Sequence, residues 1–142
     1  MTEEIVRNYL EIESLSDLNE VKKFSDNYFL DLVNPKDFQL NKFFYKQIGK
    51  KYNWFDRLVW SDKKWISYIS NTNVLTYVLK YNNDLVGFSE LIIDKKKQEI
   101  EIAYLGILEE YFGKKLGGFL LSESIKKSFL FNIKRAWVHT CS

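Results

Sequence analysis

Three glycines and two lysines gather where an apolar strand pattern gives way to a helical one, in the stretch "YFGKKLGGFLL". Gly113, Gly117 and Gly118 surround Lys114 and Lys115. Glycine weakens a helix by about 1 kcal/mol relative to alanine, and lysines in a first helical turn face the positive end of the helix dipole. A helix N-terminus also presents unpaired N–H groups, which bind anions such as phosphate. A bound phosphate would turn the two lysines into counter-charges.

The same stretch has a second interpretation, a solvated charged turn in which Glu109 and Glu110 partly neutralise the lysines. Two nucleotide-binding motifs fit poorly. A Walker loop needs Ser or Thr after its Gly-Lys pair, whereas Leu116 follows the lysines here, and Gly106 lies too far upstream. A dinucleotide loop needs Gly-x-Gly-x-x-Gly after a parallel strand, and this loop lacks that pattern.

The elements that would position the loop follow from hydrophobic periodicity. Three strand patterns with short polar turns predict an antiparallel meander over residues 74–108. A helix over 114–131 follows, and a strand at 135–140 returns parallel to its neighbour by a right-handed crossover. We therefore expect a single α+β domain with a mixed sheet, over residues 1–142.

Upstream of the meander, the pattern predicts strands at 8–14 and 28–33, with a short helix between them. Asn34 and Pro35 are expected to open the next helix, as its cap and first-turn residue. Ser61 is expected to cap a further one. Much of the aromatic content, 17% of the chain, lies in this part and around it. These rings would form either a ring-rich core or a ring-lined ligand groove.

Composition limits the class of protein. A formal net charge of +2 argues against nucleic acid as the main partner. Cys141 is the single cysteine, which forbids an intrachain disulfide and favours a reducing compartment. No apolar run approaches the ~20 residues of a membrane span, and the polar start is no signal peptide. We therefore expect a cytoplasmic protein with no membrane partner.

The phrase "ILEEYFGKKLGGFLL" resembles the coenzyme A loop of the GNAT acetyltransferase superfamily, whose pattern is Arg/Gln-x-x-Gly-x-Gly/Ala. Phe112 stands where Arg or Gln is usual, and Lys115 stands where Gly is usual. The phrases "VGFSELI", "EIEIAYLGIL" and "RAWVHTCS" resemble the superfamily's third, fourth and fifth strands. The resemblance covers almost the whole chain and implies a GNAT-like mixed sheet that lacks the superfamily's last helix and two strands.

The resemblance implies transfer of an acetyl group from acetyl-CoA, the co-substrate, to a primary amine of a small molecule or protein, without a metal. Backbone groups near Ile107 and Leu108 would align the pantetheine arm like an added strand. One N–H there would stabilise the negative charge that develops on the thioester carbonyl oxygen when the amine attacks. The residues expected to hold the pyrophosphate are Gly113, Lys114, Lys115, Leu116, Gly117 and Gly118.

Glu101 is the predicted general base, because "EIAYLGI" resembles the strand whose leading Glu has that role in the histone acetyltransferase branch. The acceptor ammonium must lose a proton before it attacks. Glu99, Glu90 and His139 are further candidates. In the alternative interpretation, Glu101 is an exposed strand carboxylate with no catalytic use.

Trp54, Asp56 and Arg57 are predicted to border the acceptor groove, because they fall in the superfamily's variable helical segment. Asp56 would hold a cationic amine, flanked by the indoles of Trp54 and Trp60 through cation–π contacts. The other interpretation is a surface turn of Asp56 and Arg57 packed on rings.

The missing C-terminal strands would leave a sheet edge exposed beside the last strand, which favours association. A homodimer through that edge is therefore one expectation. The alternative to an enzyme is a non-catalytic remnant, or an acyl-CoA-binding module.

Overall fold

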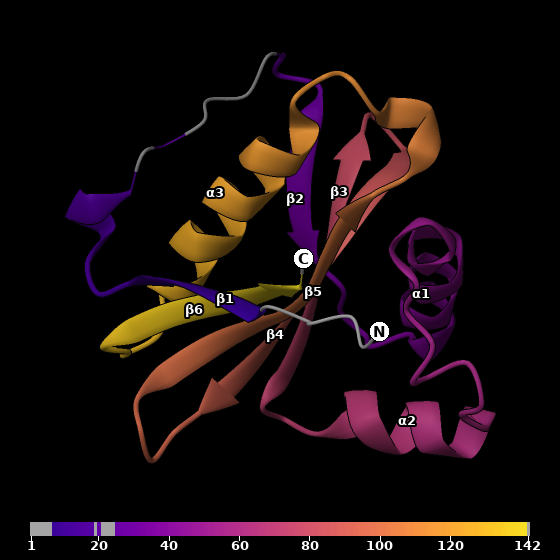
Figure 1. Cartoon of the computed structure of the whole chain (residues 1–142), viewed down its shortest axis with the longest axis horizontal. Coiled ribbons are helices and arrows are strands. Elements are labelled where there is room, and N and C mark those ends of the chain that lie inside the picture. The colour runs from indigo at the N-terminus through magenta and orange to yellow at the C-terminus, as the bar shows by residue number, and fades with distance from the viewer. Residues whose placement is uncertain (1–6, 19, 21–24, 142) are drawn as a thin grey trace, which may run out of the picture.

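The computed structural model describes residues 7–18, 20 and 25–141. Its strands form one mixed sheet in the order β1-β6-β5-β4-β3-β2. Helices α1 and α2 cover one face of this sheet and α3 covers the other (Figure 1). The strands are β1 (Arg7–Ile12), β2 (Tyr28–Leu32), β3 (Val74–Tyr81), β4 (Asp84–Asp94), β5 (Glu99–Ile107) and β6 (Arg135–Cys141). The helices are α1 (Phe38–Tyr52), α2 (Asp62–Ser70) and α3 (Leu116–Ser128), with short 3-10 turns at Leu15–Asp17 and Glu109–Tyr111.

The predicted meander and crossover are confirmed. Strands β3, β4 and β5 pair antiparallel in sequence order, and β6 returns parallel to β5 after α3. Helix α3 is shorter than predicted. It begins at Leu116, because Lys115 has a left-handed backbone (φ 58°) that no α-helix continues, and it ends at Ser128.

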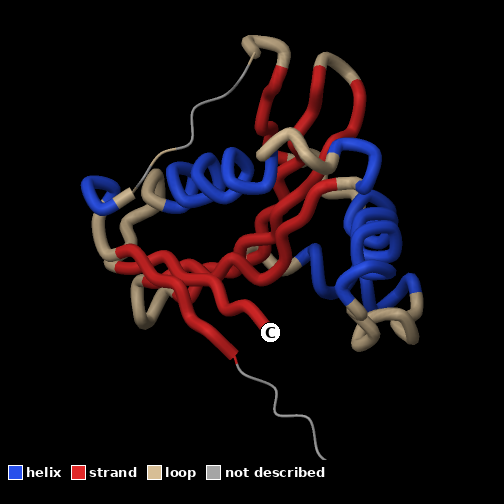
Figure 2. The backbone as a smooth tube through the Cα atoms, turned by 45° about the horizontal axis from the view of Figure 1, so that its top comes forward, coloured by secondary structure: helices blue, strands red, loops and turns tan. Residues whose placement is uncertain are grey.

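The expectation of an uncovered edge beside the last strand is wrong. Strand β1 pairs antiparallel with β6 along its whole length, from Arg7 opposite Cys141 to Ile12 opposite Ala136. In Figure 2 the two strands run side by side to the labelled C-terminus. Because β1 satisfies the backbone groups of β6, that edge offers no support for the predicted homodimer.

The predicted start of the second helical element is also wrong. Asn34 and Pro35 lie in the bend before α1, and the helix begins at Phe38. Asp37 is the N-cap, and its carboxylate accepts a hydrogen bond from the N–H of Gln39 at 3.0 Å. A capping carboxylate closer to the apolar run thus determines the boundary.

The other two helix predictions have different outcomes. Ser61 is confirmed as the N-cap of α2, because its hydroxyl accepts from the N–H of Lys64 at 3.1 Å. Of the short helix predicted after the first strand, the structure shows the 3-10 turn Leu15–Asp17. Part of the remaining predicted span lies outside the described residues.

Each face of the sheet has its own hydrophobic core. Because side chains alternate along β4, successive residues of this strand belong to opposite cores. Phe88 stacks on Phe44 of α1, with ring centroids 5.0 Å apart. Ser89, the next residue, accepts a hydrogen bond from the hydroxyl of Ser124 on α3 at 2.9 Å. Glu90 therefore points to the α1–α2 face, the same face as Phe88. Many rings are core residues, as the first interpretation of the aromatic content expected.

Candidate active site

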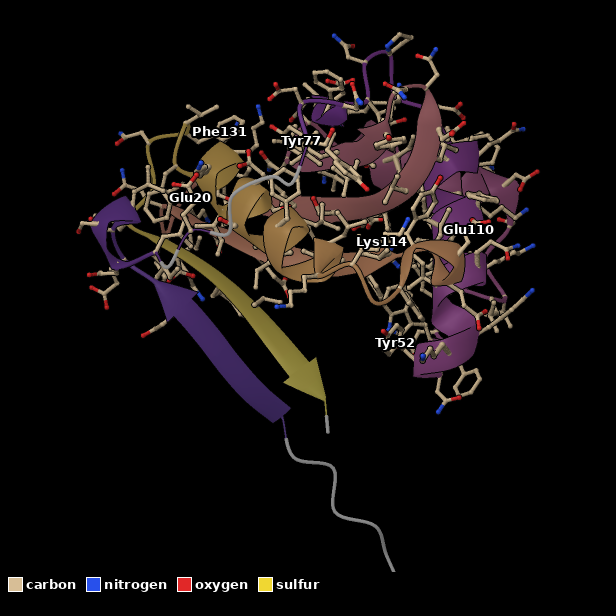
Figure 3. The ribbon with its side chains drawn as sticks, turned by 90° about the horizontal axis from the view of Figure 1, so that it is seen from above. Glu20, Tyr52, Tyr77, Glu110, Lys114 and Phe131 are labelled. Carbon is tan, nitrogen blue, oxygen red and sulfur yellow. The ribbon has the colours of Figure 1, made fainter. Side chains whose placement is uncertain are left out.

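Strands β5 and β6 form a fork. They pair only where Glu99–Glu101 lies beside Arg135–Trp137. In Figure 3, β6 with β1 at its side runs away from the connection that carries Lys114. The half of β5 after Glu101 therefore has no strand partner on this edge within the described part of the chain. Its outward backbone groups are free for a ligand.

Ile107 presents its backbone to the open side of the fork. The N–H of Leu108 donates to the carbonyl of Val86 at 2.8 Å, on the β4 side. Because an antiparallel ladder bonds alternate residues, the N–H and C=O of Ile107 and Leu105 point to the other edge. Of the two residues predicted to align the pantetheine arm, Ile107 has the required direction and Leu108 does not.

A bulge in β5 marks the place where the strand leaves β6. Glu90 lies opposite Tyr104 and Leu91 lies opposite Ile102, so Ala103 is an extra residue. A bulge bends its strand and increases the local twist. The bend at Ala103 is thus the local cause of the fork.

The glycine loop lies at the open end of the fork. Gly113 has a φ of 82°, and Lys115 has a left-handed φ of 58°. Lys115 is the N-cap of α3, and its side chain makes no capping hydrogen bond. The first N–H groups of the helix, from Leu116 to Gly118, therefore have no intrahelical partner, and the side chain of the N-cap residue does not bond to them. Such N–H groups at a helix N-terminus can bind an anion, and the anion site stays a prediction.

The two ends of the glycine loop leave room for a ligand. A Cβ built on Gly113 or Gly117 would meet no heavy atom within 4 Å. Lys114 and Lys115 are exposed. The left-handed backbone at Lys115 also explains why the superfamily pattern favours glycine there, since this conformation costs other residues about 1–2 kcal/mol.

A cation that sequence reasoning missed lies beside the loop. The ammonium of Lys51, near the end of α1, lies 4.4 Å from the ring centroid of Phe112. It stands next to the position where the superfamily pattern has Arg or Gln. A recess of about 440 Å³ separates α1 from this loop, and Lys51, Phe112 and Glu110 are among its lining residues. Only the tertiary fold brings these residues together.

The structure contains another cavity that the sequence analysis did not predict. It has a volume of about 390 Å³ and lies between α3 and the β1–β6 pair, with Gly118 near the anion site and Ile102 and Trp137 at the fork. Most of its surface is apolar. Its remaining lining residues are Glu11, Ile12, Asp17, Leu18, Leu121, Ser122, Ile125, Ala136 and Val138.

Glu101 lies at the base of the fork, where it is the last residue of β5 paired with β6, opposite Trp137. Ile100 and Ile102 join the core beneath α3, so Glu101 points to the opposite face, toward the α1–α2 side. It is half-buried. Glu99 shares its face. The side chain of His139 lies outside the described part of the chain.

Glu90 is unsuited to act as a base. It is fully buried, and both of its oxygens accept hydrogen bonds. Oε1 accepts from Arg57 Nη1 at 2.9 Å and from the Tyr68 hydroxyl at 2.8 Å. Oε2 accepts from Asn41 Nδ2 at 2.9 Å. These four side chains form a hydrogen-bonded network that joins α1, α2 and the segment between them to β4.

Arg57 is buried and surrounded by rings, so the surface-turn interpretation is wrong for this residue. Its guanidinium carbon lies 4.2 Å from the ring centroid of Tyr104, 4.4 Å from that of Tyr68 and 4.7 Å from that of Trp60. Burial lowers the pKa of Arg57, but Glu90, Tyr68 and Tyr104 together raise it, and the net shift of the pKa is upward. The sequence predicts that a cationic amine of the acceptor lies among these rings. In the structure the guanidinium of Arg57 lies there.

The other two predicted acceptor residues lie on either side of this ring cluster. Asp56 is exposed. Trp54 is half-buried, and its ring packs edge-on against Tyr104 with centroids 4.9 Å apart. The structure therefore brings Trp54 next to the face that carries Glu101, while Asp56 points to solvent.

Comparison with known proteins decides the family. Residues 38–142 match the family model described as acetyltransferase (GNAT) family. The chain belongs to the GNAT acetyltransferase family. Its enzyme class is therefore N-acetyltransferase. The match includes the meander, the glycine loop, α3 and β6, and it begins after β1 and β2. Comparison with the curated proteins finds no match.

Solved GNAT structures share the fold at low sequence identity. An aminoglycoside acetyltransferase, meta-AAC0020 from an uncultured soil metagenomic sample, has a TM-score of 0.67 at 9% identity, over 82% of this chain and 79% of that one. A GCN5-related N-acetyltransferase from Sphaerobacter thermophilus has a TM-score of 0.70 at 12% identity, over 96% of this chain but only 42% of that one. A GNAT family acetyltransferase from Elizabethkingia anophelis, with acetyl-CoA bound, has a TM-score of 0.51 at 20% identity, over 75% and 60% of the two chains.

Residues 7–18, 20 and 25–141 include no helix that is long and apolar enough to cross a membrane. The same residues contain no group of three or more His, Cys, Asp or Glu side chains that could hold a metal ion.

Proposed function

We propose that this chain transfers the acetyl group of acetyl-CoA to a primary amine of a small molecule or a protein. The observation that carries the proposal is the fork of β5 and β6, which opens at Glu101 and faces the uncapped N-terminus of α3. A ligand with an extended arm and a phosphate group fits both features, because the arm can pair with β5 and the phosphate can bind at the N-terminus of α3. A GNAT relative from Elizabethkingia anophelis holds acetyl-CoA, which supports the same ligand here.

Each part of the coenzyme site has a proposed holder in this chain. The N–H groups of Gly117 and Gly118 would bind the pyrophosphate, with Lys114 and Lys115 as counter-charges. The backbone of Ile107 would pair with the pantetheine arm. Its N–H points into the fork and would stabilise the developing oxyanion. The apolar cavity beneath α3 borders this path through Gly118.

We assign the general base to Glu101. It would accept a proton from the acceptor ammonium, directly or through water, so that the amine can attack the thioester carbonyl. The carbon–sulfur bond then breaks, and coenzyme A leaves as a thiolate. The acetylated nitrogen loses its extra proton, which the thiolate takes up directly or through water, so that an amide and free coenzyme A thiol result. Glu101 is the better placed of the two carboxylates, because it is half-buried and within reach of an acceptor, whereas Glu90 is fully buried.

Trp54 and Asp56 are the proposed walls of the acceptor groove, and Arg57 is a positioning residue that ties them to β4. The exposed carboxylate of Asp56 suits a cationic acceptor. The metagenomic relative is an aminoglycoside acetyltransferase, which makes polycationic amines the first acceptors to screen.

Binding without transfer is a second candidate function. The loop has Phe112 and a left-handed Lys115 at the two positions where the superfamily pattern has a donor side chain and glycine. A weaker pyrophosphate site would favour a module that binds acyl-CoA and transfers nothing. Release of free thiol in the presence of acceptor amines distinguishes the two candidates.

The coenzyme claim is tested by thermal unfolding with and without acetyl-CoA. A ligand at ~100 times its Kd adds about 2.7 kcal/mol to stability if it binds only the folded state. Gly117→Glu should abolish this shift, because it places a negative charge at the anion site. Gly117→Ala is the matched control, because a Cβ there meets open space. A folded protein with no shift would refute coenzyme binding.

A further inference from the structure

The segment between α1 and α2 exposes an apolar face that the proposed reaction does not use. Phe55, Leu58 and Val59 are 64%, 50% and 88% exposed; we call these three residues the outer loop face. In Figure 1 this segment lies on the side of α1 and α2 away from the sheet. Clustered exposed apolar residues on a soluble domain mark interaction sites.

The outer loop face is held rigidly from beneath. The side chain of Arg57 points inward and forms an ion pair with Glu90. The backbone N–H of Arg57 donates a hydrogen bond to the Tyr45 hydroxyl at 2.9 Å. The N–H of Leu58 donates to the carbonyl of Phe55 at 3.1 Å, which closes a turn. A surface fixed in this way loses little entropy when a partner binds.

A recess beside the outer loop face can take a partner side chain. It has a volume of about 410 Å³ and is lined by Gly49 and Trp54 together with Phe55, Leu58, Lys46 and Lys50. A Cβ on Gly49 would stand only 2.9 Å from the Cβ of Trp54. Glycine therefore permits the close contact between α1 and Trp54 at the recess.

The charge at the recess is positive and uncompensated. Lys46 and Lys50 are exposed, and neither forms an ion pair with a described residue. By contrast Lys42, on the same helix, pairs with Asp62 at 2.9 Å. The free lysines leave the rim complementary to carboxylates.

We infer that the outer loop face and its recess dock an acidic, amphipathic segment of a partner protein. An apolar side chain of the partner would enter the recess, and neighbouring Asp or Glu residues would face Lys46 and Lys50. A protein partner fits better than a lipid surface, because the site is concave. A flat lipid surface would not fill the recess, whereas a side chain of a protein segment can enter it.

The inference is tested by fluorescence anisotropy without coenzyme, so that its outcome is independent of acetyl-CoA binding. The probe is a fluorescein-labelled synthetic helix with Leu and Phe on one face and Asp and Glu on the other. Two control peptides replace the acidic residues with Lys, or the apolar residues with Ser. We expect the acidic amphipathic probe to bind at least about tenfold more tightly than either control peptide.

Variants locate the binding. Leu58→Ser and Lys46→Glu should each weaken probe binding about tenfold, while Leu130→Ser, at an exposed position on the other side of the sheet, should not. Equal binding of all three peptides would overturn the inference. So would binding to phosphatidylglycerol vesicles in place of the probe, or self-association in sedimentation that Leu58→Ser abolishes.

Discussion

The guanidinium of Arg57 and the carboxylate of Glu90 form an ion pair with Nη1 and Oε1 2.9 Å apart, and their side chains are 7% and 0% exposed. The pair joins the α1–α2 segment to the centre of β4. Asn41 and Tyr68 supply further hydrogen bonds to the same carboxylate. One buried anion thus fixes the position of two helices and the loop between them.

Breaking this ion pair should lower the stability of the folded protein. Arg57→Ala leaves a buried carboxylate without its counter-charge, and we expect a loss of about 3–5 kcal/mol in the free energy of unfolding. Urea denaturation measures this loss. The double variant Arg57→Met with Glu90→Leu removes both charges and should recover most of it. If the single variant lost under 1 kcal/mol, the pair would not hold the segment as described.

The same network predicts weaker stability at alkaline pH. Burial and the neighbouring Glu90 carboxylate raise the pKa of Tyr68 above its ordinary 10.0, although Arg57 lowers it. The unfolded chain therefore loses this proton first as the pH rises. The stabilisation is complete below pH 10 and is lost above it. Denaturant titrations from pH 8 upward should show a smaller alkaline loss in Tyr68→Phe than in the original protein, and an equal loss would contradict this assignment.

Glu101→Gln tests the proposed base. The variant keeps the shape of the side chain and removes its ability to accept a proton, so we expect kcat to fall about 10²–10⁴-fold. The thermal shift given by acetyl-CoA should be unchanged, because Glu101 does not belong to the phosphate loop. Glu99→Gln, on the same face of β5, is the matched control. An unchanged kcat in Glu101→Gln would show that Glu101 is not the general base.

Lys51 should contribute to coenzyme affinity from outside the superfamily motif. Its ammonium lies beside Phe112, where the motif lacks its usual donor. Because an exposed charge contributes up to about 1 kcal/mol, we expect Lys51→Met to weaken acetyl-CoA binding about three- to fivefold in calorimetry. Lys46→Met, on the same helix but away from the loop, should bind normally. Equal affinities of the two variants would exclude a role for Lys51.

Local patterns predicted much of the fold, and the errors have a common origin. The meander followed from alternating residues and polar turns, which act over a few positions. The partner of β1 did not follow, because strand pairing across the length of the chain leaves no local signal. Similarly, Asn34 and Asp37 both have side chains that can cap a helix, and the sequence prediction chose the one farther from the apolar run.

The candidate site divides in the same way. The glycines led to the prediction of an anion loop, and the positive φ of Gly113 shows one of the backbone conformations that glycine permits. The burial of Arg57 did not follow, because a lone arginine is mostly exposed and its partner Glu90 lies far along the chain. Lys51 and the cavity beneath α3 were missed because neighbours on different elements create them.

The pairing of β1 with β6 has a consequence for how the protein acquires its structure. The first and last strands of the described sheet are neighbours, so the chain must be synthesised as far as Cys141 before the whole ladder can form. Contacts between residues so distant in sequence slow folding, because the intervening chain must first be ordered. We expect the meander, with its short turns, to assemble early and the β1–β6 ladder to close the sheet last. Until then the backbone edge of β6 is open to other chains.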